Sequence, residues 1–338
     1  MGWQMGLTDA DKAKLREFKD CFCPYKPINT ILNDLESLYQ SSEIGGEQLS
    51  MLLRGDTGTG KSAIINHFSY AKNESQPESI PVLLSRVPSK LTVEDMTRQL
   101  LSDLGVFGST THRARNSQSD AHLTNRLLDA LKVKRTKMII INEFQELIEF
   151  KGARDRQAIG NRLKLISEEA AVPIVLAGMP WIDEILNDSQ WASRLATRTH
   201  TLQYFSLSKR PQEYREFLEA IEQYIPCDLE TSLTDFEISL ALFAASCGEM
   251  RQLKAILTET IQLCLINGKP LSKQALSNSF SNLYSGADNP FETPKEKIKI
   301  QEVEMHSQYI RGDSTHRASI QPRKLSEIMT LSQILSKK

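Results

Sequence analysis

The 338-residue sequence lacks several features that mark common functional classes. It has only five cysteines, an odd and scattered set, so we expect no disulfide framework and a reducing, cytoplasmic setting. No apolar run approaches the roughly 20 residues that span a bilayer, and the polar first segment has no signal-peptide core. We therefore expect no membrane association. The net charge of -1 excludes a histone-like or arginine-rich chain but is compatible with a local basic groove.

The remaining composition predicts a folded protein of more than one domain. Hydrophobic residues make up 40% of the chain, which is enough for a sizeable core. The length suits a main domain with a smaller companion. Cys21 and Cys23 lie close together in the sequence, but no second Cys or His pair follows at ligand spacing. A metal site at this pair is therefore disfavoured.

Short apolar runs alternate with amphipathic segments over the first two thirds of the chain. Strands are predicted at residues 48–53, 80–87, 137–141, 173–177 and 200–205. Helices are predicted at residues 61–71, 92–104, 122–132, 155–171 and, in two pieces, 181–196. This alternation predicts an α/β fold with a five-stranded parallel sheet that is covered on both faces.

Strand signals stop after residue 206, and the rest of the chain divides into a helical part and a tail. Four helices are predicted at residues 211–224, 235–246, 250–266 and 272–283. The tail is rich in Ser, Lys and Glu and is expected to be mostly flexible. Its apolar cluster within residues 325–335 forms either a docking helix or a helix that packs on its own domain. The predicted parts are an N-terminal arm at 1–24, an α/β domain at 25–206, a helical lid at 207–284 and the tail at 285–338.

One motif points to the chemistry of the α/β domain. The residues between the first strand and the next helix match the phosphate-loop pattern G-x-x-x-x-G-K-[ST]. Glycines let the backbone turn its N–H groups inward, and together with the helix N-terminus these groups bind phosphate. Lys61 adds a charge for the β- and γ-phosphates, and Ser62 offers its hydroxyl to Mg²⁺. The predicted ATP-binding residues are Gly55, Asp56, Thr57, Gly58, Thr59, Gly60, Lys61 and Ser62.

A second motif follows the apolar strand that ends at Ile141. Asn142 and Glu143 are expected at the carboxyl edge of the sheet, where α/β proteins bind ligands. Glu143 is the candidate general base for the attacking water. Asn142 stands where Asp is usual, and its amide keeps an oxygen acceptor without the charge. We therefore predict that Ser62 and Asn142 hold Mg²⁺ weakly, that ATP binds and that hydrolysis is slow.

Three arginines are candidates for sensing the nucleotide. Arg194 precedes the fifth strand, where its guanidinium could reach the γ-phosphate in a neighbouring subunit, that is, in trans. Arg198 is a weaker candidate for the same role, and a surface ion pair is the alternative for Arg194. Arg251 opens a helix of the predicted lid and could reach over the nucleotide; a plain surface position is its alternative.

The order of these parts resembles an AAA+ ATPase. A strand between the two motifs and the glutamate after Asn142 are typical of the additional-glutamate class of P-loop ATPases, and disfavour a small-molecule kinase. Three segments resemble the TniB/TnsC family of bacterial transposition ATPases: PIVLAGMP at 173–180, YREFLEAIEQYIP at 214–226 and IQLCLINGKP at 261–270. The sequence departs from the usual pattern at Asn142 and at Ala177-Gly178, where many AAA+ proteins have an Asn or Thr sensor.

The resemblance implies a regulator of transposition. Members of this family form ATP-dependent rings or filaments on double-stranded DNA, receive a signal from a TniQ-type adaptor and activate a transposase of the TnsA/TnsB type. One branch works with RNA-guided targeting complexes, and the shortness of the chain favours that branch. The alternatives are another AAA+ DNA protein, such as a helicase loader or initiator, and a weakly hydrolysing nucleotide-binding scaffold.

Basic side chains in the loops expected near the pore of a ring could contact DNA phosphates without reading bases. A solvated surface position is the alternative for each of them. Assembly could compensate for a small footprint, because several weak contacts add up along one DNA. The candidate DNA contacts are Arg86, Lys90, His112, Arg113, Arg115, Lys151, Arg154 and Arg156.

Overall fold

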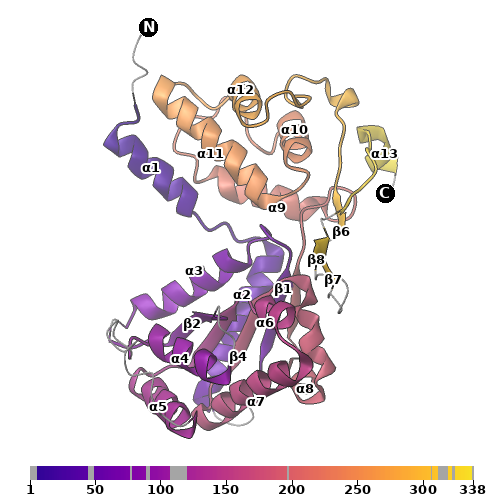
Figure 1. Ribbon diagram of the computed structural model, residues 1–338. Coiled ribbons are helices and arrows are strands. Elements are labelled where there is room, and N and C mark those ends of the chain that lie inside the picture. Colours follow the sequence, from indigo (N-terminus) through magenta and orange to yellow (C-terminus); the bar gives the residue numbers. More distant parts are fainter. Residues whose placement is uncertain are drawn as a thin grey trace. The chain divides into compact units, whose positions relative to one another are not determined.

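The chain folds into two compact units, which we call the sheet unit and the helical unit. The sheet unit takes in Thr30–Leu202 and Ser307–Pro322. The helical unit takes in Met1–Asn29, Gln203–His306 and Arg323–Lys338. The computed structural model describes residues 6–44, 49–76, 78–88, 92–106, 120–195, 198–305, 307–310, 319–321 and 324–336 (Figure 1).

This grouping differs from the boundaries expected from the sequence. The N-terminal arm belongs to the helical unit, and a piece of the C-terminal tail returns to the sheet unit. Both differences arise from packing between segments that are far apart in the chain, which composition alone does not reveal. In the described part of the chain, no helix combines the length and the apolar character that crossing a bilayer requires.

A five-stranded parallel sheet forms the centre of the sheet unit, as predicted (Figure 1). The strand order is β2-β3-β4-β1-β5. β4 therefore separates β1 from β3 in space, whereas β2, which separates them in the sequence, lies at the edge. β3 and β4 are buried almost throughout, as expected for interior strands covered on both faces. The bounds are β1 (Met51–Gly55), β2 (Val82–Arg86), β3 (Met138–Asn142), β4 (Ile174–Gly178) and β5 (Thr199–Leu202).

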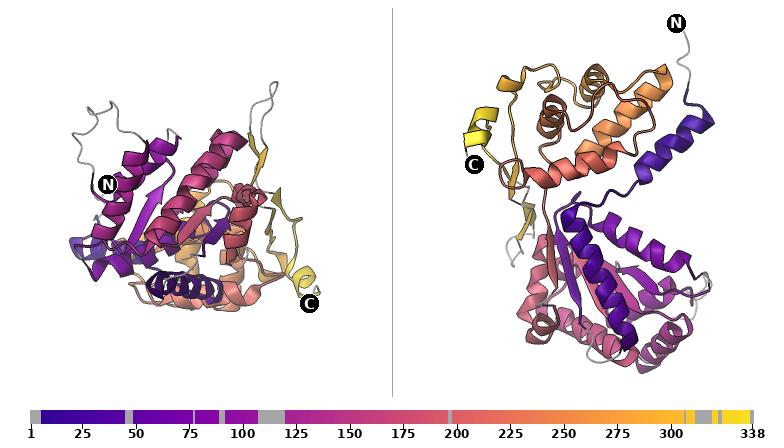
Figure 2. Two further views of the ribbon diagram at one scale, coloured as in Figure 1. Left: turned by 90° about the horizontal axis from the view of Figure 1, so that it is seen from below. Right: turned by 180° about the vertical axis from the view of Figure 1, so that it is seen from behind.

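Helices cover both faces of this sheet (Figure 2). On one face, apolar side chains of α4, α5, α7 and α8 and of the 3-10 helix η2 form one core with Leu83 and Ile139 of the strands. On the other face lie α2 and α3, where Tyr39 packs edge-on against Phe68 with ring centroids 6.3 Å apart. The bounds are α2 (Lys26–Ile44), α3 (Lys61–Glu74), α4 (Val93–Asp103), α5 (Asp120–Val133), α6 (Gln145–Phe150), α7 (Ala153–Ala170), η2 (Pro180–Asn187) and α8 (Ser189–Leu195).

The helical unit contains the four helices predicted after residue 206. An aromatic cluster joins Phe205 to the first two of these helices, with ring centroids 5.4 Å apart between Phe205 and Tyr214 and 5.2 Å apart between Tyr214 and Phe243. Burial raises the pKa of Tyr214, whose hydroxyl donates to the carbonyl oxygen of Ser239 at 3.0 Å. The bounds are α9 (Pro211–Glu222), α10 (Phe236–Ser246), α11 (Met250–Asn267) and α12 (Lys273–Leu283).

The expectation of a mostly flexible tail needs correction for the residues that the structure describes. Phe291, Ile298 and Ile300 are buried, and the buried Glu302 accepts hydrogen bonds from the amide and the hydroxyl of Ser208 at 2.7 and 2.6 Å. β6 pairs with β9 and β7 with β8, all antiparallel. The tail elements are η3 (Lys295–Lys297), β6 (Val303–Met305), β7 (Gln308–Ile310), β8 (Ser319–Gln321), β9 (Lys324–Leu325) and α13 (Leu331–Ser336).

The candidate docking helix of the tail corresponds to α13. It contacts η3 of the same unit, and its residue Ile334 is buried. Packing on its own domain, the second of the two alternatives, therefore describes α13 as it stands in the structure.

The N-terminal arm forms α1 (Asp9–Asp20) and packs against α11. Thr8 caps this helix, because its side chain accepts a hydrogen bond from the amide of Asp11. The two buried residues of α1 are Leu15 and Phe18. Lys254 of α11 donates to the carbonyl oxygen of Lys19 at 2.7 Å and so holds the end of α1.

We predict that Phe18→Ala destabilises the helical unit by about 3–5 kcal/mol, because the change leaves a cavity where a fully buried ring now packs. Urea unfolding followed by circular dichroism measures this free energy. Glu17→Ala, on the exposed side of the same helix, is the matched control and should change the free energy by less than about 0.5 kcal/mol. Equal stability of the two variants would show that α1 is not part of this core.

Candidate nucleotide-binding site

The phosphate loop connects the carboxyl end of β1 to the amino end of α3, as the motif predicts. β1 pairs with β4 on one side and with β5 on the other, so the sheet holds the start of the loop on both sides. Gly58 and Gly60 have φ angles of 77° and 98°, a region of backbone conformation that favours glycine. The turn leads directly into α3, whose first N–H groups have no partners within the helix and form an anion-binding end.

Lys61 lies against the loop itself. Its Nζ donates to the carbonyl oxygens of Gly55 at 2.7 Å and Asp56 at 2.9 Å. Ser62, the next residue, is exposed on the first turn of α3. Both residues thus lie in the first turn of α3, and an ammonium group and a hydroxyl at this helix end suit contacts with phosphate and Mg²⁺. These roles, and those of the other loop residues, stay predictions.

Asn142 ends β3 with a side chain that suits a magnesium ligand. In the parallel register it lies opposite Arg86 of β2. Its Oδ1 is buried and, among the residues that the structure describes, has no hydrogen-bond partner. A buried carbonyl oxygen without a donor costs free energy, and Mg²⁺ with its bound water would satisfy it. The geometry therefore fits the role predicted for Asn142 together with Ser62.

Glu143 has an unusual backbone and a well-held side chain. Its φ angle is 55°, a region that costs a non-glycine residue about 1–3 kcal/mol and often occurs at functional sites. Oε2 of Glu143 accepts a hydrogen bond from Nε2 of Gln145 at 2.6 Å. Oε1 of Gln145 in turn accepts from the backbone amide of Met179 at 3.1 Å. The buried Gln145 therefore ties the candidate general base to the end of β4.

Gly178, the last residue of β4, makes room for this connection. A Cβ atom at this position would lie 2.6 Å from Oε1 of Gln145 and 2.8 Å from Cγ2 of Ile182, closer than real Cβ contacts. The strand end has no Asn or Thr of its own, but Gln145 brings an amide side chain to the same place from α6. The sequence gives no direct signal for Gln145, because its role depends on β3 and β4 being neighbours.

The segment after β3 carries a row of glutamates. Burial raises the pKa of Glu146, and the charge of Glu143 adds to this shift while Arg86 opposes it. Burial also raises the pKa of Glu149, although a hydrogen bond from Nε1 of Trp181 at 2.9 Å works in the opposite direction. Ionisation of these glutamates is therefore disfavoured at this edge of the sheet, and a cation bound there would favour their ionised forms.

The family model of the bacterial TniB protein matches residues 15–204. The match covers more than half of the chain, including the phosphate loop and the residues from Asn142 to Gln145. The chain belongs to the TniB family. No curated protein sequence matches it.

Solved structures of origin proteins resemble this TniB family member in fold. The Aeropyrum pernix ORC1 protein in complex with DNA has a TM-score of 0.56 at 17% identity, over 79% of this chain and 67% of that one. The Aeropyrum pernix ORC2 protein in its ADPNP-ADP complexes has a TM-score of 0.58 at 15% identity, over 81% and 72%. Drosophila ORC bound to DNA has a TM-score of 0.51 at 15% identity, over 84% and 69%. These likenesses show that the chain shares the α/β fold of these proteins, including the helices that follow the sheet.

The candidate sensor arginines lie in different units of this TniB family member. Arg194, near the end of α8, forms an ion pair with Glu168 of α7, and its side chain is 11% exposed. Its Nη1 is buried without a partner among the described residues. Arg198 donates to the carbonyl oxygen of Asp34 at 3.2 Å. Arg251 is exposed near the start of α11 in the helical unit. The sensor roles stay predictions.

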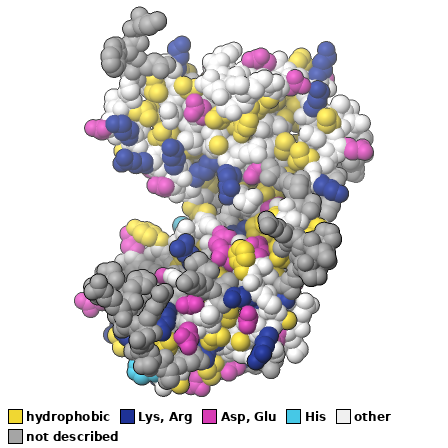
Figure 3. All heavy atoms as spheres, in the orientation of Figure 1, with side chains coloured by type: hydrophobic (Ala, Val, Ile, Leu, Met, Phe, Trp, Pro, Cys, Tyr) yellow, Lys and Arg dark blue, Asp and Glu magenta, His cyan; other side chains and the backbone are white. Residues whose placement is uncertain are grey.

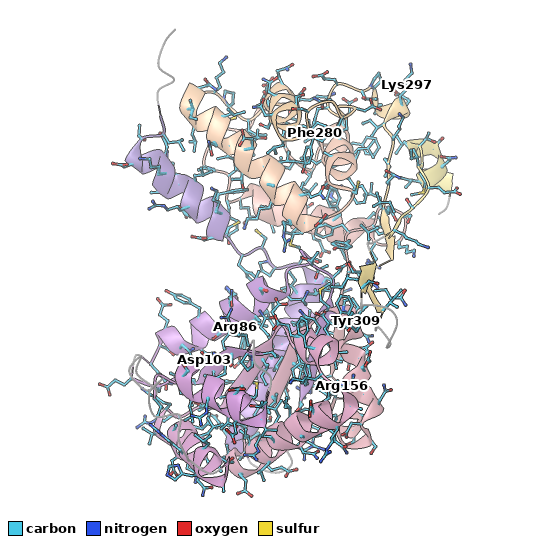
Figure 4. All side chains as sticks on the ribbon, in the orientation of Figure 1. Arg86, Asp103, Arg156, Phe280, Lys297 and Tyr309 are labelled. Atoms are coloured by element: carbon cyan, nitrogen blue, oxygen red, sulfur yellow. The ribbon has the colours of Figure 1, made fainter. Side chains whose placement is uncertain are left out.

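The candidate DNA contacts also have different surroundings. Arg86 is exposed at the end of β2 (Figure 4). Arg154 is exposed on α7, and Lys151 is half-buried between α6 and α7. Arg156 pairs with Glu184 and lines a cavity of about 370 Å³, so it is engaged within its own unit. On the face seen in Figure 3, the Lys and Arg side chains of the sheet unit are scattered rather than gathered in one patch. The other candidates, Lys90, His112, Arg113 and Arg115, lie outside the described residues.

We predict that Gln145→Ala lowers kcat for ATP hydrolysis roughly ten- to hundredfold, because Glu143 loses the hydrogen bond that orients it. The Kd for ATP should stay within about twofold, because Gln145 contacts no residue of the phosphate loop in the described structure. Phosphate release and nucleotide titration measure the two quantities. Gln157→Ala, an exposed glutamine on α7, is the matched control.

The hydrogen bonds of Gln145 can also be disturbed by a substitution in β4. Gly178→Ala places a methyl group 2.6 Å from Oε1 of Gln145, so this side chain must shift and kcat should fall in the same way. An unchanged kcat in both variants would contradict the positioning role of Gln145.

Proposed function

We propose that this TniB family member is an ATP-dependent regulator of DNA transposition. It binds ATP with Mg²⁺, assembles on double-stranded DNA as a ring or filament, and links a TniQ-type adaptor to a TnsA/TnsB-type transposase. The proposal rests on one observation in a chain of the TniB family. A complete phosphate loop lies at the same edge of the sheet as Glu143, and hydrogen bonds through Gln145 connect Glu143 to the end of β4.

The residues of the site divide the chemistry among them. The loop amides and Lys61 bind the phosphates, and Ser62 and Asn142 hold Mg²⁺, which when bound offsets the charge of the phosphates. Glu143 orients the attacking water and accepts its proton. Because Asn142 contributes no charge, we expect Mg²⁺ to be held weakly and the bound ATP to be long-lived.

We propose that ATP favours the assembled state through Arg194. In an assembly, Arg194 of one subunit would reach the γ-phosphate bound by the next, so that ATP binds the assembly better than the monomer. Its ion pair with Glu168 must open for this contact. The side chain of Glu168 is 56% exposed, and an ion pair of this kind is weak enough to exchange for a phosphate. Arg251 would contact the same nucleotide from the helical unit.

The proposal that the protein binds DNA rests on its family and on proteins of similar fold. Two structures of similar fold contain bound DNA: the Aeropyrum pernix ORC1 protein in complex with DNA and Drosophila ORC bound to DNA. Basic side chains such as Arg86, Lys151 and Arg154 would supply contacts to phosphates that do not depend on sequence. Each contact is weak, but in an assembly the contacts of several subunits combine along one duplex.

We predict that Lys61→Ala abolishes ATP-dependent retention of a fluorescent duplex, because the γ-phosphate loses its main cationic partner. Glu143→Gln should bind ATP but hydrolyse it very slowly, so its complexes with DNA should outlive those of the unaltered protein. Fluorescence anisotropy before and after ATP is diluted away measures retention and lifetime. Gln157→Ala is again the control. Retention by Lys61→Ala equal to that of the unaltered protein would contradict the proposal.

A second candidate function is a nucleotide-binding scaffold that does not turn over. It is favoured by the neutral Asn142 at the end of β3. In this case ATP would stabilise the assembly without being consumed. Phosphate release with DNA and Mg²⁺ that equals the Lys61→Ala background would support the scaffold over the ATPase.

We predict that Asn142→Asp lowers the Mg²⁺ concentration needed for half-maximal hydrolysis about thirtyfold. The added charge contributes about 2 kcal/mol to a divalent ion 4 Å away in water, which corresponds to this factor. A Mg²⁺ titration of phosphate release measures the shift, and Asn187→Asp, at the end of η2, is the matched control. No shift in Asn142→Asp would show that this side chain does not take part in holding Mg²⁺.

A further inference from the structure

A segment near the C-terminus lies against the phosphate loop. Ser307 and Asp56 are 251 positions apart in the chain, yet both belong to the sheet unit. The backbone amide of Ser307 donates to Oδ2 of Asp56 at 2.8 Å, and its hydroxyl donates to Oδ1 at 3.0 Å. Asp56 is the second residue of the phosphate loop and is fully buried. A residue of the tail therefore contacts the predicted ATP site directly.

A second contact holds the same segment in place. Tyr309, in β7, stacks on Trp181 of η2 with ring centroids 6.1 Å apart and an interplanar angle of 28°. Its hydroxyl donates to the carbonyl oxygen of Glu149, in α6, at 2.9 Å (Figure 4). β7 also pairs with β8, with Tyr309 opposite Ile320. The residues Ser307–Ile310, which we call the strap, thus join the phosphate loop to the segment that follows Glu143.

The carboxylate of Asp56 needs these donors. The other donor that the structure describes for it is the amide of Thr57, at 2.7 Å from Oδ1. A buried carboxylate with too few donors is costly. It is also close to where the phosphates of ATP are predicted to bind, and two negative groups repel each other. The hydrogen bonds from Ser307 stabilise the negative charge of Asp56 and hold the phosphate loop in a conformation that suits phosphate binding.

We infer that the strap is part of the nucleotide site, and that Ser307 is a positioning residue that supports ATP binding through Asp56. This inference rests on the proposed function, because it assumes that the phosphate loop binds ATP. According to this inference, the affinity for ATP also depends on residues that follow the helical lid in the sequence. ATP binding and the C-terminal segment are therefore coupled, and an event that removes the strap from Asp56 weakens ATP binding.

The test uses the full chain and measures the Kd of a fluorescent ATP analogue with Mg²⁺. Ser307→Ala keeps the backbone donor but loses the hydroxyl, and it should raise the Kd at least roughly tenfold, as expected for a lost hydrogen bond to a charged group. Ser332→Ala, at an exposed serine of α13, is the matched control. Tyr309→Ala should also raise the Kd, with Tyr224→Ala as its control at a partly exposed tyrosine.

A double-mutant cycle separates positioning from a general loss of structure. In the Asp56→Asn background no charge needs to be held, so adding Ser307→Ala should change the Kd less than twofold. An equal effect of Ser307→Ala in both backgrounds, or a Kd unchanged from the unaltered protein, would overturn the inference. The proposed function fails separately, if the unaltered protein does not bind the analogue or if Lys61→Ala binds it equally well.

Discussion

The parallel pairing of β1, β4 and β3 is the constraint on which the candidate site depends. Parallel strands end at the same edge, so this pairing brings three strand ends together that lie far apart in the sequence. β1 delivers the phosphate loop, β3 delivers Asn142 and Glu143, and β4 delivers Gly178. The helices on the two faces bury the strands and keep these ends in register.

Hydrogen bonds of buried polar side chains position the residues of the candidate site. Gln145 joins Glu143 to the amide of Met179, and Ser307 joins the tail to Asp56. In each case a buried polar group is satisfied by a segment that is not its neighbour in the sequence, as burial requires. Oδ1 of Asn142 is one of five buried side-chain atoms that have no hydrogen-bond partner among the described residues, and its place at the end of β3 fits a bound ion. The same rule thus explains the contacts that Gln145 and Ser307 make and indicates what Oδ1 of Asn142 would bind.

The sequence predicted the parts whose signal is local. The five strands are apolar runs, and the phosphate loop is a contiguous motif, so both are found where expected, within a few residues. α6 was missed because six residues are too few to show a helical period. Gln145 was missed because its partner on β4 is 34 positions away. The packed part of the tail was missed because its buried residues, such as Phe291 and Ile300, are widely spaced among polar ones.

We propose a nucleotide-gated assembly in which the phosphate loop and Glu143 of one subunit act together with Arg194 of the next. The most direct test is the mass of the purified protein in solution with ATP, with ADP and without nucleotide, each with and without duplex DNA. The account predicts large complexes only when ATP and DNA are both present. A monomer under all conditions would contradict it, because Arg194 would then have no neighbouring nucleotide to contact.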